Sequence, residues 1–402
     1  MSVFAELVGQ ERVVAQLTAA AAAAVAGGAG MTHAWLFTGP PGSGRSVAAR
    51  AFAAALECPE QGCGHCPACT TVQAGTHADV DFVVPEGLHI LMDEAREIVR
   101  RASSAPMVGR WRIVVVEDAD RLEERTSNTL LKILEEPPPR GVLLLCAPAA
   151  DDLPATIRSR CRLVALGTPR VAAVAEVLER RDGVTREVAA FAARAAQGHV
   201  GRARRLACDP DAQRRRREVL ALPSEVGSVP GCFLAAENLV AATAEEAAAA
   251  TAPRDAAETR ALRESLGDTG TDTAEDTAGG PGGRAGRGGG RAKPMLRGTA
   301  GAIKDLERRQ RSRGTRTQRD ALDRALADLA ALYRDVLIVQ LGARVPLINA
   351  DLQPAIATMA TTSTPEATLR RVEATFACRT AIEANVPPLL AVEALTLRLR
   401  AG

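Results

Sequence analysis

Residues 39–46 have the sequence Gly-Pro-Pro-Gly-Ser-Gly-Arg-Ser, which is the phosphate-binding pattern G-x-x-x-x-G-K-[ST] with one substitution. The glycines of such a loop let backbone N–H groups wrap a polyphosphate, and the following helix points its positive end at the same ligand. Arg45 stands where the pattern has lysine, and a planar, forked guanidinium does not replace a compact ammonium. The sequence predicts a loop of nucleotide-binding type that binds ATP poorly or does not hydrolyse it. Its candidate ligand-binding residues are Gly39, Gly42, Ser43, Gly44, Arg45 and Ser46.

Two acidic residues, Glu117 and Asp118, follow the apolar β-branched run 113–116. ATPases with such a loop end a strand in Asp-Glu, where the Asp holds Mg²⁺ through water and the Glu polarises the attacking water. The order is inverted here. The Glu117 side chain is one methylene longer than the Asp that holds Mg²⁺, and the Asp118 side chain is one methylene shorter than the catalytic Glu. The pair predicts a degenerate magnesium site, with a solvated turn as the alternative.

Four cysteines lie within one short segment with the spacing C-x4-C-x2-C-x2-C. Four thiolates suit tetrahedral Zn²⁺ at about 2.3 Å per bond and leave no open position for water, so the predicted role is structural. The alternative is a set of reduced, buried thiols. His65 lies inside the cluster and is interpreted as a bystander. The predicted metal ligands are Cys58, Cys63, Cys66 and Cys69.

Arginines at two further places are candidates for phosphate contacts. Arg160 lies in the segment 156–161 after the fourth predicted strand, where an arginine is either solvated or projects into a neighbour's phosphate site. Arg202 follows a glycine-bounded turn at a helix start. The Gly/Arg stretch at 284–291 is interpreted as a flexible linker, with nucleic-acid binding as the alternative.

Alternating strand and helix patterns must position these residues. Helical spacing separates short apolar runs at 33–38, 81–84, 113–116, 142–146 and 163–166, which favours a parallel sheet covered on both faces. Residues 167–222 have helical periodicity with interleaved arginines. The helical pattern continues beyond about 225, with a break at 278–301 that contains ten glycines.

Composition excludes several classes of protein. A net charge of +2 over 402 residues does not suit a basic nucleic-acid coat. No apolar run approaches the length of a membrane span, and the alanine-rich stretch 18–26 is predicted to be a helix and not a signal peptide. Nine cysteines with four in one cluster favour a cytosolic metal site over a disulfide scaffold, so we expect a cytoplasmic protein without membrane contact.

With these pieces in order, the chain resembles the subunits of the bacterial DNA polymerase III clamp loader, within the AAA+ ATPases. Residues 4–11 look like the family's opening box, which lies near the adenine. Residues 128–138, Asn-Thr-Leu-Leu-Lys-Ile-Leu-Glu-Glu-Pro-Pro, are similar to a signature of these subunits, and Ser159-Arg160-Cys161 matches their arginine-finger motif. A four-cysteine zinc module after the loop's helix is particular to this group. The likeness runs over residues 3–222.

The resemblance implies an architecture. It comprises an α/β RecA-like AAA+ domain with a parallel sheet at 1–166, carrying a zinc module at 58–69, and a small helical lid at 167–222. An all-α C-terminal collar at 223–402 follows, interrupted by a flexible low-complexity segment at about 265–315. The group has an ATPase motor type, tau/gamma, with an intact lysine and an Asp-Glu pair. It also has a stator type, delta-prime, with a degenerate site. Arg45 and the inverted acids resemble the stator type.

A stator of this kind assists ATP-driven loading of the sliding clamp onto primer-template DNA. Its implied partners are the tau/gamma and delta subunits of a hetero-pentamer, and Arg160 would act in trans on a neighbour's ATP. The implied cofactors are structural Zn²⁺ and, at the degenerate site, ATP with Mg²⁺, without intrinsic ATPase activity. The alternatives are an active tau/gamma-like ATPase and a zinc-containing nucleic-acid-binding protein.

Overall fold

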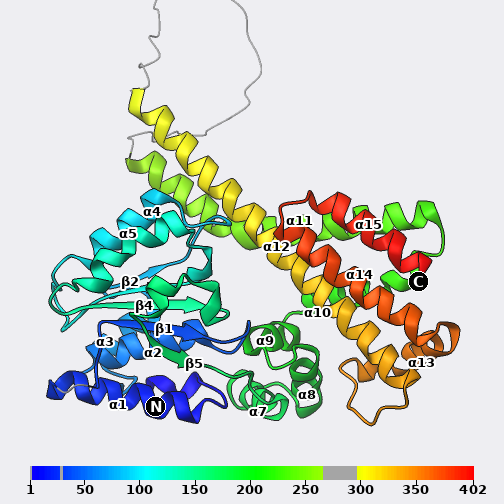
Figure 1. The fold of residues 1–402 in the computed structure, drawn as a ribbon, viewed down its shortest axis with the longest axis horizontal. Coiled ribbons are helices and arrows are strands. Elements are labelled where there is room, and N and C mark those ends of the chain that lie inside the picture. The colour runs from blue at the N-terminus through cyan, green and yellow to red at the C-terminus, as the bar shows by residue number, and fades with distance from the viewer. Residues whose placement is uncertain (1, 28–29, 266–296) are drawn as a thin grey trace, which may run out of the picture.

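The computed structural model describes residues 2–27, 30–265 and 297–402. Figure 1 shows a sheet-containing N-terminal domain (residues 2–166), a small helical lid (α7–α9) and a long helical collar (α11–α15). Helix α10 (Pro210–Glu225) connects the lid to the collar. No helix within these described residues is long and apolar enough to cross a membrane.

Five parallel strands form the sheet of the N-terminal domain, in the order β2-β3-β4-β1-β5. All five predicted strands are confirmed within about a residue at each end, and the parallel α/β class with them. Short apolar runs between helices specify this arrangement because a parallel sheet is covered on both faces. The strands are β1 (Ala34–Thr38), β2 (Val80–Val83), β3 (Arg112–Val116), β4 (Gly141–Ala147) and β5 (Arg162–Ala165).

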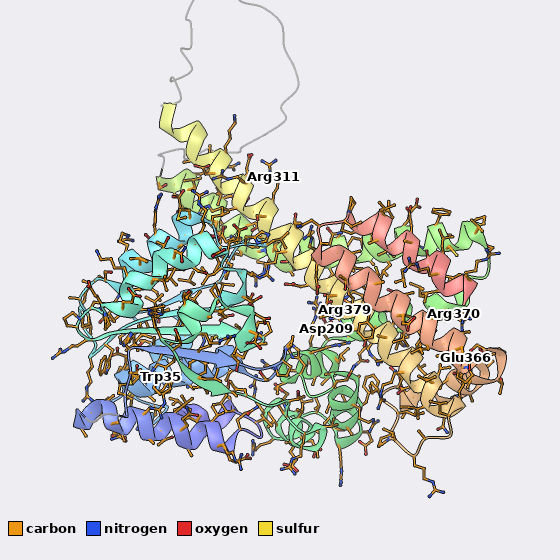
Figure 2. The ribbon with its side chains drawn as sticks, viewed as in Figure 1. Trp35, Asp209, Arg311, Glu366, Arg370 and Arg379 are labelled. Atoms are coloured by element: carbon orange, nitrogen blue, oxygen red, sulfur yellow. The ribbon has the colours of Figure 1, made fainter. Side chains whose placement is uncertain are left out.

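Side chains alternate across the sheet and bury two separate cores. Trp35 and Phe37 of β1 pack with Phe52 on one face, and Trp35 lies deep inside the domain (Figure 2). Leu36, between them in sequence, packs on the other face. The first face is covered by α1 (Glu11–Ala26), α2 (Arg45–Glu57) and α3 (Pro67–Ala74), and the second by α4 (Met92–Ala102), α5 (Glu124–Glu135) and α6 (Ala155–Arg158).

The lid is an alanine-rich three-helix unit made of α7 (Val171–Asp182), α8 (Arg186–Ala195) and α9 (Val200–Cys208). Helix α10 adds Ala212 to the lid core and Leu222 to the collar core. The predicted boundary at 222 therefore falls inside a helix that belongs to both units.

The collar is built from two long helices and three shorter ones. Leu322, Leu326 and Tyr333 of α12 are buried against the other collar helices. The helices are α11 (Val229–Ser265), α12 (Arg297–Gln340), α13 (Gln353–Thr362), α14 (Pro365–Glu383) and α15 (Pro388–Ala401). Short 3-10 helices occur at η1 (Val3–Glu6), η2 (Ala119–Arg121), η3 (Ala150–Asp152) and η4 (Ala350–Leu352).

The flexible segment predicted at about 265–315 needs correction on its C-terminal side. Residues 266–296 lie outside the described residues. Residues 297–315, however, belong to α12, so the prediction that they form a flexible linker is wrong. Residues 297–315 are basic rather than glycine-rich, and Arg313 among them pairs with acidic residues far away in the sequence. Arg313 and Arg316 are held there by acidic side chains of α11 and of the N-terminal domain.

Candidate nucleotide site and cysteine cluster

The phosphate-binding pattern forms the turn between β1 and α2, as its mechanism requires. Gly39, Gly42 and Gly44 have positive φ angles of 153°, 86° and 94°, which side chains other than glycine rarely adopt. At Gly42 the lid approaches very closely. A Cβ atom added there would lie 2.2 Å from Cγ and 2.6 Å from Cα of His199. The second glycine of the loop therefore makes room for the lid.

Arg45 turns back onto its own loop. Its Nη1 donates a hydrogen bond to the carbonyl oxygen of Gly39 at 2.8 Å. Ser43 is buried in the same loop. The buried Gln10 donates from Nε2 to the carbonyl oxygens of Ser43 at 3.2 Å and Gly167 at 2.6 Å. These contacts tie the N-terminal box and the connection to the lid against the loop, and they commit part of the Arg45 guanidinium to the backbone.

The two acids after β3 occupy different environments. Burial raises the pKa of Glu117, and the nearby Asp118 adds to this, while Ser46, Arg50 and Arg316 oppose it. Asp118 has a left-handed backbone with φ of 47°. Its carboxylate pairs with the Arg316 guanidinium of α12 and lies 3.7 Å from Nε of Arg121. Coordination of Mg²⁺ by Asp118 would therefore compete with two arginines of the same chain.

Lid residues close the site from the other side. His199 accepts a hydrogen bond at Nδ1 from the backbone N–H of Arg202 at 3.2 Å and so caps the start of α9. Burial lowers the pKa of His199, and the positive charges of Arg202, Arg324 and Arg45 lower it further. The Arg202 guanidinium pairs with Asp328 of α12. A contact between Arg202 and a nucleotide stays a prediction.

Arg160 lies on the surface, in the turn between α6 and β5. Its Nη1 donates to the carbonyl oxygen of Thr156 at 2.8 Å, and its Nη2 lies 2.7 Å from a carboxylate oxygen of Glu135 on α5. Arg158 in the same turn pairs with Asp151. Arg160 is thus exposed and oriented by Glu135, which lies in the segment 128–138.

Sulfur atoms of the four predicted ligands converge at the junction of α2 and α3. All four Sγ atoms lie within 4.8 Å of one another. Cys58 Sγ is 3.6 Å from Sγ of Cys63 and 3.7 Å from that of Cys66. Four thiolates around Zn²⁺ at about 2.3 Å each would be about 3.8 Å apart. The cluster therefore fits a tetrahedral zinc ion.

Backbone N–H groups point at these sulfur atoms. The N–H groups of Glu60 and Cys63 donate to Cys58 Sγ at 3.3 and 3.4 Å, and the N–H of Cys69 donates to Cys66 Sγ at 3.4 Å. Burial alone would raise the pKa of Cys58, but the N–H groups of Cys63, Gly62 and Glu60 outweigh it and lower the pKa to about 7. At Cys66 burial prevails over the Cys69 N–H and raises the pKa. Donors of this kind stabilise thiolates, which are the form that binds metal. His65 Nδ1 engages the carbonyl oxygen of Cys63 at 3.1 Å.

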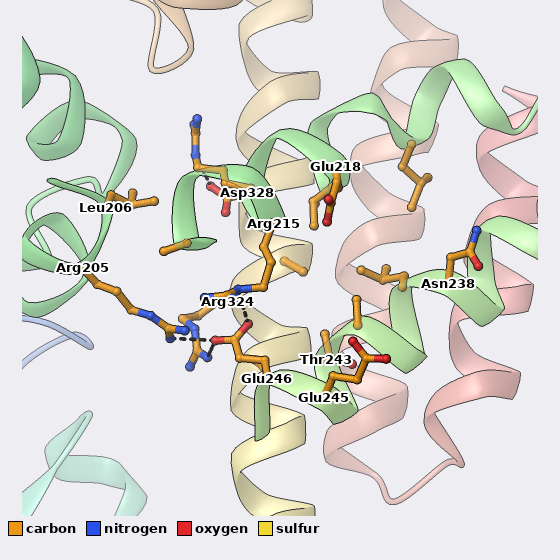
Figure 3. Close-up of a pocket in the computed structure, with 18 of the residues that line it drawn as sticks. Arg205, Leu206, Arg215, Glu218, Asn238, Thr243, Glu245, Glu246, Arg324 and Asp328 are labelled. Atoms are coloured by element: carbon orange, nitrogen blue, oxygen red, sulfur yellow. Dashed lines mark hydrogen bonds and ion pairs between the residues drawn. The ribbon is translucent and has the colours of Figure 1, made fainter. Parts of the chain in front are cut away.

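An arginine-rich pocket of about 640 Å³ lies where the lid meets the collar (Figure 3). Glu246 of α11 sits among three guanidiniums, at 2.7 Å from Arg205, 2.9 Å from Arg324 and 3.4 Å from Arg215. Burial would raise the pKa of Glu246, but Arg205 and Arg324 outweigh it and lower the pKa. These ion pairs hold the lid helices to the collar helices.

Sequence reasoning missed Arg316, the residue of α12 that reaches Asp118. Its local signal is the arginine-rich run 308–319, which overlaps the end of the segment at about 265–315 that the sequence predicts to be flexible. A helical reading of that run would have placed Arg313 and Arg316 one turn apart, on one face.

Comparison with known proteins finds relatives of the segment that carries this site. Residues 9–170 match the family model described as DNA polymerase III, delta subunit. The chain is 34% identical over 177 residues to DNA polymerase III subunit delta' of Escherichia coli and 37% identical over 154 residues to that of Pseudomonas aeruginosa. Residues 9–170 are thus similar to DNA polymerase III subunits over the segment that carries the phosphate loop and the cysteine cluster. The chain is also 35% identical over 162 residues to subunit gamma/tau of Mycobacterium tuberculosis, so identity does not separate the two subunit types.

The likeness covers only part of each protein. The Escherichia coli match spans 42% of this chain and 53% of the relative, and the Mycobacterium tuberculosis match spans 39% and 27%. The chain thus spans about half, or less, of the length of these curated relatives. Among solved structures, the RuvB Holliday junction branch migration motor of Thermotoga maritima is 19% identical, with a TM-score of 0.38 over 53% of this chain and 63% of that one.

Proposed function

We propose that this chain is a delta-prime-like stator subunit of the clamp loader. One observation carries the choice over a motor subunit: both charged groups that a motor needs free are engaged within the chain. Arg45 donates to the Gly39 carbonyl oxygen, and Asp118 is paired with Arg316 and Arg121. These contacts hold part of the Arg45 guanidinium away from a γ-phosphate and hold the Asp118 carboxylate away from Mg²⁺.

In this proposal Arg160 supplies positive charge to the ATP of a neighbouring tau/gamma-type subunit. Its exposure and its orientation by Glu135 support a role toward a partner. The complex would include delta, act on the sliding clamp and primer-template DNA, and work in the cytoplasm. Structural Zn²⁺ would be held by Cys58, Cys63, Cys66 and Cys69, whose geometry fits it.

ATP turnover by the purified chain tests the choice between stator and motor. We expect turnover at background, and no change in Asp118→Asn. Turnover well above background that Asp118→Asn abolishes would favour the tau/gamma-like motor instead. A tau/gamma-type subunit assayed in the same buffer shows that the conditions support hydrolysis.

The nucleic-acid-binding alternative rested on the Gly/Arg tract at 284–291, which lies outside the described residues. Strong, salt-dependent DNA affinity of the isolated chain, lost on deletion of 279–319, would favour it over the stator.

A further inference from the structure

We propose that α11 and α12 form an intramolecular clasp, in which Arg313 and Arg316 lock the collar to the N-terminal domain and keep Asp118 from binding a divalent cation. The locking part stands on its own, whereas the cation part rests on the proposed stator function. Figure 1 shows the two helices side by side, extending from the collar to the edge of the sheet domain near α4.

Arg313 is the buried centre of the clasp. Only 9% of its side chain is exposed, and it faces acids from both sides of the boundary. Its Nη2 lies 3.0 Å from Glu86 of the N-terminal domain and 2.9 Å from Glu258 of α11, and its Nη1 pairs with Asp255 of α11. Arg254 of α11 approaches the same Glu86 carboxylate at 3.4 Å. Burial distinguishes this group from exposed ion pairs, which contribute little to stability.

Arg316, one turn further along α12, reaches the acids after β3. Its guanidinium donates to the carbonyl oxygen of Pro85 and to the Asp118 carboxylate. Arg121 lies 3.7 Å from the same carboxylate and donates to the carbonyl oxygen of Gly87 at 3.3 Å. The segment 85–87, which follows β2, is thereby tied to α12 through its backbone and its side chains.

Backbone approach supports the same contact independently of charge. A Cβ atom added at Gly87 would lie 2.7 Å from Oγ of Ser312. A side chain at this position would require the Ser312 hydroxyl to rotate away, so Gly87 and α12 are in close contact here. Close packing and ion pairing therefore occur at the same contact, between the segment 85–87 and α12.

The clasp also changes what Asp118 can bind. An unpaired carboxylate at the end of a strand beside a phosphate loop is a ligand for Mg²⁺. Here a divalent cation would first have to displace Arg316 and then tolerate Arg121. Opening the clasp would therefore expose the Asp118 carboxylate, and closing it would withdraw this carboxylate from the nucleotide site.

Hydrogen exchange measured by mass spectrometry on the full chain tests the locking part. In the double variant Arg313→Ala/Arg316→Ala, we expect exchange in segments 85–91 and 117–122 to rise about tenfold or more, since the opening that exposes them loses its ionic restraint. Glu86→Gln/Asp118→Asn should have the same effect from the other side. The control is Arg308→Ala/Arg311→Ala on the same helix. These arginines are exposed and, among the described residues, pair with Asp305 and Glu307 of their own helix; Figure 2 shows Arg311 pointing away from the domain.

Unchanged exchange in both clasp variants, with the lid and collar protected as in the parent, would overturn the locking proposal. An equal rise in exchange in the control variant would overturn it as well, because the rise would then come from removing positive charge anywhere on α12.

Titration with Mn²⁺, followed by paramagnetic resonance, tests the cation part. We expect Arg316→Ala to bind Mn²⁺ at least fivefold more tightly than the parent, and Arg316→Ala/Asp118→Asn to lose this gain. Equal affinity in the parent and Arg316→Ala would overturn this part alone. Because the assay needs no ATP turnover, its failure is distinguishable from failure of the stator proposal.

Discussion

Replacing Cys66 with serine should remove the metal and destabilise the N-terminal domain, and the structure allows the size of this effect to be bounded. The observed sulfur separations of 3.6 and 3.7 Å differ little from the spacing of about 3.8 Å that a zinc tetrathiolate needs. The site is therefore preformed, and binding costs little reorganisation. Cys58 and Cys69 are fully buried in the core that also contains Phe52.

For a preformed site, metal stabilises the folded domain by mass action. Free zinc buffered at a thousand times the dissociation constant contributes about 4 kcal/mol. Loss of one of four thiolates removes most of that affinity, so Cys66→Ser should lower the unfolding free energy of this domain by about 3–4 kcal/mol under such buffering.

The assay combines elemental analysis with denaturant unfolding of reduced, freshly purified chain. The parent should contain about one zinc per chain. The control is Cys208→Ser, at an exposed cysteine of the lid, which should keep both zinc and stability. Parent protein without zinc, and as stable with a chelator as without it, would refute the reasoning.

Two further predictions follow from single side chains. Arg160→Ala should leave folding and assembly intact but lower the ATPase rate of the complex reconstituted with tau/gamma-type partners by roughly a thousandfold at the affected site. The matched control is Arg158→Ala, because Arg158 lies in the same turn and pairs with Asp151. An unchanged ATPase rate with Arg160→Ala would contradict the role in trans. Asp79→Ala should lower the unfolding free energy by about 2–4 kcal/mol, measured by denaturant unfolding. The fully buried Asp79 carboxylate accepts three backbone N–H bonds from residues 107–109 at 2.6–2.7 Å. The control is Asp93→Ala, at a side chain that is 94% exposed, which should leave the unfolding free energy unchanged. Burial favours a higher pKa for Asp79, but these N–H groups outweigh it and lower the pKa. The carboxylate therefore stabilises the fold above the unfolded pKa of about 3.9, and this stabilisation is lost as pH falls through the folded pKa. Acid unfolding below about pH 4 measures this loss, and equal acid sensitivity of the parent and Asp79→Ala would contradict the prediction.

Local chemistry made the sheet and the two clusters of site residues predictable. A strand buried on both faces is an unbroken apolar run, and each of the five runs is a strand. The phosphate loop and the cysteine cluster each lie within twelve consecutive residues or fewer, so their spacing alone brings their groups together. The four cysteine sulfurs converge because turns at Gly62 and Gly64, both with positive φ, fold the segment onto itself.

Only the tertiary structure decided what each charged group at the site contacts. Asp118 meets Arg316 across 198 residues, and Arg202 meets Asp328 of the collar. No local periodicity specifies such partners, because a long guanidinium finds its carboxylate through the packing of whole helices. The sequence by itself determined that a phosphate loop with the wrong cation is present. Packing of α12 and of the lid decided that Asp118 and Gly42 are covered by the chain's own residues, since burial and long-range charge depend on the complete fold.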